Sequence, residues 1–183
     1  NLRDRNRVAL ESDLKSAAAA GVKNFLVSTG AFFGEQGRRE AKSVHDLDPV
    51  QLVRLLGGEV PGLGITLSVV EQLLEMTPHF FSKARQAGAE YAVLRYPGVA
   101  VPVRAVGKDE PRPLATEKLE QLFAHLRTAQ TYLPCLVQVT ADDNGLSVAR
   151  AVRKSGAARG VYVCGGATRD RLTTFREEAK AAT

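Results

Sequence analysis

The sequence predicts an α/β protein with a parallel β-sheet, folded as a single domain over residues 1–183. Three observations lead to this prediction. Apolar segments of strand length alternate along the chain with segments of helical period, which is the order of β/α units. The strand segments are apolar along their length, as in parallel strands covered on both faces. Hydrophobic residues make up 44% of the chain, which is enough for a buried core.

The first part of the chain is expected to contain two helices around one strand. Residues 6–20 have helical period and stop at Gly21, because glycine commonly follows the end of a helix. Residues 23–28 then form an apolar strand. After a long polar loop, Asp48 is placed to cap a helix that has Pro49 in its first turn.

The middle of the chain adds two strands and the helix between them. Residues 63–69 are an apolar run of strand length. Thr77 and Pro78 are a cap and a first-turn proline, so a helix is expected from there to Gly88. Residues 90–95 form the third strand.

The last part of the chain is expected to add two strands and three helices. Thr116 is placed to cap a helix that runs to about residue 128, and residues 134–139 form the fourth strand. Residues 144–156 form a helix that begins at an Asn-Gly pair and ends at a glycine. The fifth strand covers 160–164, and Thr168 caps the last helix.

Two architectures fit this order of one helix followed by five β/α units. One is a (β/α)8 TIM barrel, of which the chain supplies about five units, and the other is an open doubly wound parallel sheet. The first strand is followed by neither a G-x-G-x-x-G fingerprint nor a P-loop, which disfavours a nucleotide-binding open sheet. A complete barrel takes about 250 residues, so we expect residues 1–183 to be the C-terminal part of a barrel.

The composition narrows the classes of function. The net charge of +5 is spread along the chain, so we expect a solvated surface or a site for a small anion and no nucleic-acid partner. No apolar stretch is long enough for a membrane span, and the charged N-terminus does not resemble a signal peptide. Cys135 and Cys164 lie in apolar runs, as expected for buried thiols of a cytoplasmic protein. The histidines, at 45, 79 and 125, are not clustered, so no metal site is expected.

A succession of short motifs resembles the methylenetetrahydrofolate reductase family. It is most similar to the bacterial branch that carries "CRDRN…ALQSDL…GI.N.L..TGD…VFD.DS", and the match is dense over residues 3–56 and thin over 63–183. The matching segments are Arg3-Asp4-Arg5-Asn6, ALESDL at 9–14, GVKN at 21–24, Thr29-Gly30 and VHDLD at 44–48, followed by Lys83 with AGAEYAV at 87–93 and GVYV at 160–163.

The resemblance implies a (β/α)8 barrel with FAD at the C-terminal ends of the strands. NADH or NADPH would reduce the flavin, which would pass hydride to 5,10-methylenetetrahydrofolate and so give 5-methyltetrahydrofolate. The family's catalytic Glu belongs to the first barrel strand, which we expect to precede Asn1, so no catalytic residue is assigned. The implied cofactor-binding residues are Thr29, Gly30, Ala31, Ser68 and Lys83, and the implied substrate-binding residues are Arg95 and Tyr96.

The chain also departs from the family pattern. Ala31 stands where the family has an acidic residue beside the flavin and the folate, and Thr29 stands where an Arg is often found. Arg95 stands where a Gln addresses the pterin, and an Arg cannot accept a hydrogen bond. Residues 67–71 lack the Tyr and His of the family's "AxYPExH" strand. These losses favour an alternative function, a catalytically degenerate barrel that acts as a partner subunit or as a small-anion-binding module.

Most candidate residues also have a structural interpretation. Gly30 fits a turn as well as a close approach to a cofactor, and the Thr29 hydroxyl fits a local hydrogen bond. Lys83 fits a solvated helix face, and Tyr96 fits a packed position as well as a stacking one. Arg95 is different, because a charge at the end of a buried strand is costly unless it is paired or faces a cleft. There it would bind a carboxylate or a phosphate in bidentate fashion.

Three further expectations concern loops and assembly. Phe32 and Phe33 are expected to plug the barrel end or to form a wall for an aromatic ligand. Asp4 or Asn6 is expected to cap the first helix, and the acidic run that begins at Asp142 is expected to cap the helix after the fourth strand. A homo-oligomer and a heteromeric partner subunit both stay open.

Overall fold

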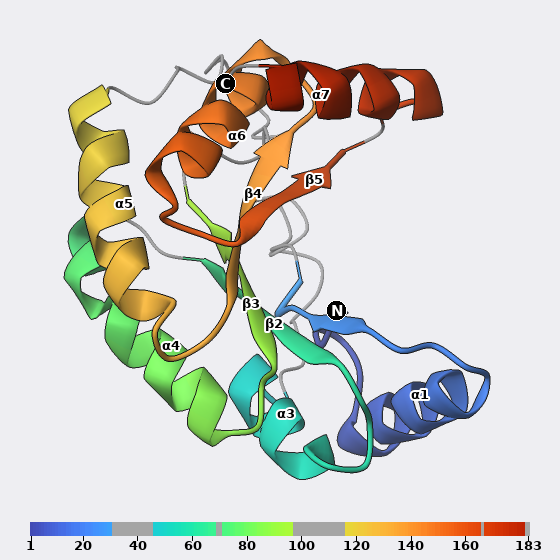
Figure 1. Ribbon diagram of the computed structural model, residues 1–183. Helices are drawn as coiled ribbons and strands as arrows, with labels where there is room; N and C mark the ends of the chain where they lie inside the picture. Colours follow the sequence, from blue (N-terminus) through green and yellow to red (C-terminus); the bar gives the residue numbers. More distant parts are fainter. Residues whose placement is uncertain (31–45, 69–70, 97–115, 166, 182–183) are drawn as a thin grey trace, which may run out of the picture.

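The protein is a half-barrel made of a curled, five-stranded parallel sheet with helices between the strands (Figure 1). The computed structural model describes residues 1–30, 46–68, 71–96, 116–165 and 167–181. The strands are β1 (Phe25–Val27), β2 (Leu63–Ser68), β3 (Tyr91–Arg95), β4 (Cys135–Thr140) and β5 (Gly160–Cys164). They lie side by side in the order of the sequence, and every neighbouring pair is parallel.

The expected helices are all present, with small shifts at their ends. They are α1 (Arg7–Ala19), α3 (Pro49–Leu56), α4 (Thr77–Gln86), α5 (Thr116–Ala129), α6 (Asp143–Ser155) and α7 (Arg169–Ala181). A short 3₁₀ helix, η1 (Glu71–Met76), was not expected. Helices α3, α4, α5 and α6 follow the convex side of the sheet (Figure 1). Because the strand order does not reverse, successive right-handed connections place these helices on the same side.

Three helices begin at the residues that the sequence indicates. At the start of α7, the Thr168 hydroxyl oxygen accepts a hydrogen bond from the Arg171 N–H at 3.3 Å. The Asn6 side chain accepts a hydrogen bond from the backbone N–H of Ala9 and so caps α1. Asp48 and Gln51 form a reciprocal capping box at the start of α3, with Pro49 in the first turn. Asp4 does not cap α1 and instead has a positive φ of 61°.

The starts of two other helices differ from the prediction. Thr77 does not cap α4 but is its buried first residue, and its hydroxyl donates to the Leu74 carbonyl oxygen at 2.7 Å. The reason is that η1 runs directly into α4. Helix α6 begins one residue before the expected Asn144, because Asp142 is its cap and accepts from the Gly145 N–H at 2.7 Å.

The core lies between the convex face of the sheet and the helices. Alternate strand residues such as Ile65, Leu94 and Val137 are at most 1% exposed, and they pack with apolar helix residues such as Phe81 and Leu122. The two faces therefore differ, which corrects the expectation of strands apolar along their length and covered on both faces. Residues on the concave face are more polar and mostly half-exposed or exposed; they include Thr66, Ser68, Arg95, Thr140 and Tyr162.

Candidate functional site

A cleft of about 510 Å³ opens at the carboxyl edge of the sheet. The β1–β2 ladder ends at the pair Val27–Ile65, whereas β2 stays paired with β3 as far as Ser68 and Arg95. The residues after β1 therefore diverge from the last residues of β2, and the cleft lies between them. Its volume is within the range of small-molecule sites. The lining residues are Asn1, Ser28, Thr29, Gly30, Asp48, Pro49, Val50, Ile65, Thr66, Leu67, Ser68 and Arg95.

Four of the residues singled out from the sequence meet in this cleft. Thr29 and Gly30 follow β1, Ser68 ends β2, and Arg95 ends β3. They come together because the carboxyl ends of parallel strands share one edge of a sheet. Sequence reasoning missed the contribution of Asp48, which was expected only to cap a helix.

The other predicted site residues do not line the cleft. Lys83 is exposed on α4, within the helical layer. Tyr96 is only 2% exposed and belongs to the hydrophobic core, which matches its interpretation as a packed residue. Ala31 and the pair Phe32-Phe33 lie outside the described residues, so nothing is added to those three predictions.

The chain around Gly30 is held by local contacts with residues 1–3. The backbone N–H groups of Leu2 and Arg3 donate to the carbonyl oxygens of Ser28 and Thr29, at 3.0 and 3.1 Å. Gly30 has a φ of 96°, a conformation that strains other residues, and a Cβ there would lie 3.4 Å from the Cβ of Arg3. The positive φ of this turn therefore accounts for the glycine.

Arg95 is the one cationic side chain among the described residues that line the cleft. Among the described lining residues, the charged side chains are Asp48 and Arg95. The start of α3 offers little to an anion, because Pro49 has no N–H and the Gln51 N–H is already bound to Asp48. Arg95 is half-buried and has five N–H donors in a planar fork. Arg95 is therefore the side chain of the described lining that is best suited to hold an anion.

The concave face continues from Arg95 to a thiol on β5. Gln138 donates from Nε2 to Cys164 Sγ at 3.2 Å, and the thiol donates to the Val139 carbonyl oxygen at 3.3 Å. Burial raises the pKa of Cys164, and the Gln138 hydrogen bond and the Arg95 charge offset part of this effect. Cys135 lies on the convex face, where burial raises its pKa to about 12. Both thiols are therefore protonated at neutral pH, which does not suit a nucleophile.

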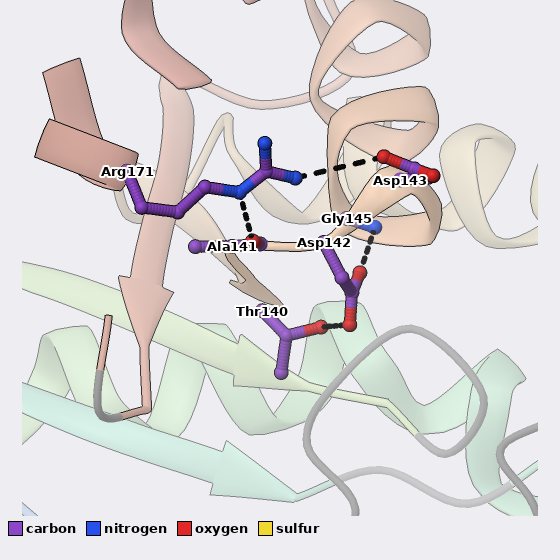
Figure 2. A network of polar contacts seen from close by, with 6 residues as sticks. All are labelled: Thr140, Ala141, Asp142, Asp143, Gly145 and Arg171. Atoms are coloured by element: carbon purple, nitrogen blue, oxygen red, sulfur yellow. Dashed lines mark hydrogen bonds and ion pairs between the residues drawn. The ribbon is translucent and has the colours of Figure 1, made fainter. Parts of the chain in front are cut away.

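The turn between β4 and α6 is fixed by a hydrogen-bond chain next to this face (Figure 2). The Thr140 hydroxyl donates to Asp142 Oδ2 at 2.5 Å, and Asp142 Oδ1 accepts from the Gly145 N–H. Gly145 is required here, because a Cβ would overlap the Thr140 carbonyl oxygen. The acidic run after the fourth strand thus caps a helix, as expected.

Arg171 connects α7 to the same turn (Figure 2). Its Nε donates to the Ala141 carbonyl oxygen at 2.9 Å, and its Nη2 lies 3.5 Å from Asp143 Oδ1. No sequence signal identified this arginine, because its partners lie about 30 residues away and depend on how α7 packs.

A second cleft, of about 580 Å³, lies on the convex side between α6, β5 and α7. Its walls are largely apolar, with Val152, Val161 and Phe175 among them, and basic side chains stand at its rim. Arg153 at this rim donates to the Ala179 and Lys180 carbonyl oxygens at the end of α7. Arg153 therefore helps to cap the C-terminal end of α7.

The described residues contain no metal-binding cluster. No group of three or more His, Cys, Asp or Glu side chains in this part of the chain is arranged to hold an ion. His79 is exposed on α4, His125 is half-buried on α5, and His45 lies outside the described residues. Within the same ranges, no helix is both long and apolar enough to cross a membrane.

No protein-family model matches the chain, and a search of curated proteins finds no relative for it. The resemblance to methylenetetrahydrofolate reductases therefore rests on the motifs themselves.

Proposed function

We propose that the chain is part of a flavoprotein of the methylenetetrahydrofolate reductase type. It would form five β/α units of a (β/α)8 barrel and bind the flavin end of FAD at the carboxyl edge of its sheet. The observation that carries the proposal is the convergence of Thr29, Gly30, Ser68 and Arg95 in one cleft. The resemblance assigns cofactor and substrate contacts to these positions from the motifs alone.

The hydroxyl groups that line the cleft suit the flavin ring and ribityl chain of FAD. Hydroxyl side chains of Thr29, Thr66 and Ser68 line the side of the cleft near β1 and β2, and they can donate to ring carbonyl groups or bind ribityl hydroxyls. The Ser28 hydroxyl, which also lines the cleft, already donates to Asn1 Oδ1 at 2.7 Å and can only accept a further hydrogen bond. Among the lining residues that the structure describes, Arg95 is the one cationic side chain. The cleft volume also suits one end of a dinucleotide better than the whole molecule.

In this proposal the residues of the chain bind and orient, and FAD supplies the hydride chemistry when it is bound. The hydroxyl-lined side holds the cofactor, and Arg95 holds an anionic group of the substrate next to it. Arg95 stays cationic throughout, because a guanidinium group is not deprotonated in proteins. Proton transfer then requires a group other than Ala31, since a methyl side chain cannot ionise.

Flavin binding tests the proposal directly. Titration of the purified protein with FAD should give a yellow complex, and NADH or NADPH should bleach it in the absence of oxygen. Ser68→Trp places a bulky ring in the cleft and should weaken FAD binding about tenfold or more. Ser147→Trp, an equal change on the exposed face of α6, should leave FAD binding within twofold. A wild-type protein that stays colourless with excess FAD contradicts the proposal.

A second candidate function is a small-anion-binding module without redox activity. Arg95 favours it, because an arginine stands where the reductases carry a glutamine. Such a module, alone or as a partner subunit, would bind phosphate or a small carboxylate and would not consume NADH or NADPH. Anion binding that Arg95→Met abolishes, in a protein that takes up no flavin, selects this function.

A further inference from the structure

Four side chains at one level of the sheet form a row across its concave face. Ser68 of β2 is paired with Arg95 of β3, and Gln138 of β4 is paired with Tyr162 of β5. The β3–β4 register, whose last pair is Leu94–Val137, puts Arg95 beside Gln138 when it is continued by one residue. We call these four residues the concave row.

Independent contacts show that the members of the row share a face. Cys164 is hydrogen-bonded to Gln138 and senses the charge of Arg95, so all three lie on the same side. Tyr162 is two residues before Cys164 in β5 and therefore has the same orientation. Tyr91, which lies over Gly64, has a pKa raised by burial and, to a smaller extent, by the neighbouring Tyr162. The convex side is the side of Val161 and Val163, which line the second cleft.

Three of the four side chains of the row are accessible to solvent, and Gln138 is largely buried. Ser68 is exposed, Arg95 is half-buried, Gln138 is 9% exposed and Tyr162 is 41% exposed. Adjacent strands are about 4.8 Å apart, so Arg95 and Tyr162 are separated by about two strand spacings. The sheet curls toward this side (Figure 1).

The row combines three kinds of recognition. Tyr162 offers an exposed aromatic ring on which a flat ring can stack. Gln138 carries an amide, which both donates and accepts, although one of its N–H groups is engaged with Cys164. Arg95 offers a planar cation that binds a carboxylate or phosphate through two parallel hydrogen bonds. A molecule that uses all three groups is flat, has a hydrogen-bonding ring edge and carries an anionic substituent.

We propose that the concave row binds a planar heteroaromatic ring with an anionic substituent. The ring stacks on Tyr162, its polar edge meets Gln138, and the anion is held by Arg95, with the Ser68 hydroxyl beside it. This deepens the proposed function, on which it rests for the position of the site, by naming the class of substrate. It also assigns amide recognition to Gln138, one strand away from the arginine that replaced the family's glutamine.

Three small probes separate the three contributions. Orotate has a heteroaromatic ring, amide edges and a carboxylate, uracil has the same ring without the carboxylate, and benzoate has a carboxylate on a ring without amide edges. Their affinities for the full chain are measured by ligand-observed NMR or calorimetry, without flavin or NAD(P)H. Orotate should bind about tenfold or more tightly than either of the other probes, because uracil lacks the carboxylate that Arg95 would bind and benzoate lacks the amide edge that Gln138 would bind.

Each variant should remove the contribution of one side chain to probe binding. Arg95→Met should lower the affinity for orotate about tenfold and leave uracil within twofold. Gln138→Leu should remove most of the preference of the protein for orotate over benzoate. Tyr162→Leu should weaken all three probes, whereas Tyr132→Leu should change none by more than twofold. Tyr132 is the matched control because it is 47% exposed, outside the sheet, in the turn before β4.

The affinities of the three probes test this proposal independently of the FAD titration. Equal affinity for the three probes, or no binding of any, overturns the proposal even in a protein that binds FAD. The selectivity pattern described above supports it even in a protein that takes up no flavin. If Arg95→Met does not fold, Arg95→Gln serves instead, and unchanged orotate affinity in that variant also overturns the proposal.

Discussion

Replacing Phe81 with alanine should lower the free energy of unfolding by about 4 kcal/mol. Phe81 lies on α4 with none of its side chain exposed, between the helix and the convex face of the sheet. Its truncation removes apolar burial and leaves a cavity that the parallel strands beneath cannot easily fill. A loss of this size is a large fraction of the stability of an ordinary domain.

The adjacent phenylalanine provides the control. Phe80 is on the same helix but only partly buried, so Phe80→Ala should cost less than half as much as Phe81→Ala. Both values are measured by urea unfolding followed by circular dichroism. Equal losses at the two positions would show that α4 does not pack on the sheet through the face that contains Phe81.

Gly145→Ala should lower the free energy of unfolding by about 3 kcal/mol. The added methyl group would overlap the carbonyl oxygen of Thr140, so the backbone between β4 and α6 has to move. That movement also disturbs the bond from the Gly145 N–H to Asp142 Oδ1, which caps α6. The cost is large because the obstacle is backbone and not a flexible side chain.

Ser147→Ala is the matched change for this second stability prediction. Ser147 is exposed on the same helix, two residues further on, and its replacement should change stability by no more than about 0.5 kcal/mol. The same unfolding experiment compares the two variants. A Gly145→Ala protein as stable as Ser147→Ala would mean that the turn is not packed against Thr140 as described.

The order and type of the main elements were predictable from the sequence, because each carries its own local signal. Helix α3 is an example, since Asp48 and Pro49 mark its start and apolar residues such as Leu52 and Val53 mark its buried face. Strand β5 is another example, because a short apolar run between two glycine-containing turns predicts a strand. The 3₁₀ helix η1 was not predictable in this way. Thr77 has the residue type of a helix cap, but η1 runs directly into α4, so Thr77 lies inside the helical segment and does not cap it.

The candidate site was predictable only in part, because it depends on which strands are neighbours. Strand ends at Gly30, Ser68 and Arg95 were identifiable, and a parallel sheet brings such ends together. The partnership of Gln138 with Tyr162 was not, because it depends on a register that pairs residues 24 positions apart. Gln138 did leave a signal, because it is an amide side chain within the apolar run that forms most of β4.

The position of the ligand is tested most directly by hydrogen–deuterium exchange with and without FAD. Binding at the carboxyl edge predicts slower exchange at Ser28, Thr29 and Gly30 and in residues 66–68, with no change in the second cleft between α6, β5 and α7. Protection confined to that second cleft, with exchange at residues 28–30 and 66–68 unchanged, would contradict a functional site at this edge of the sheet.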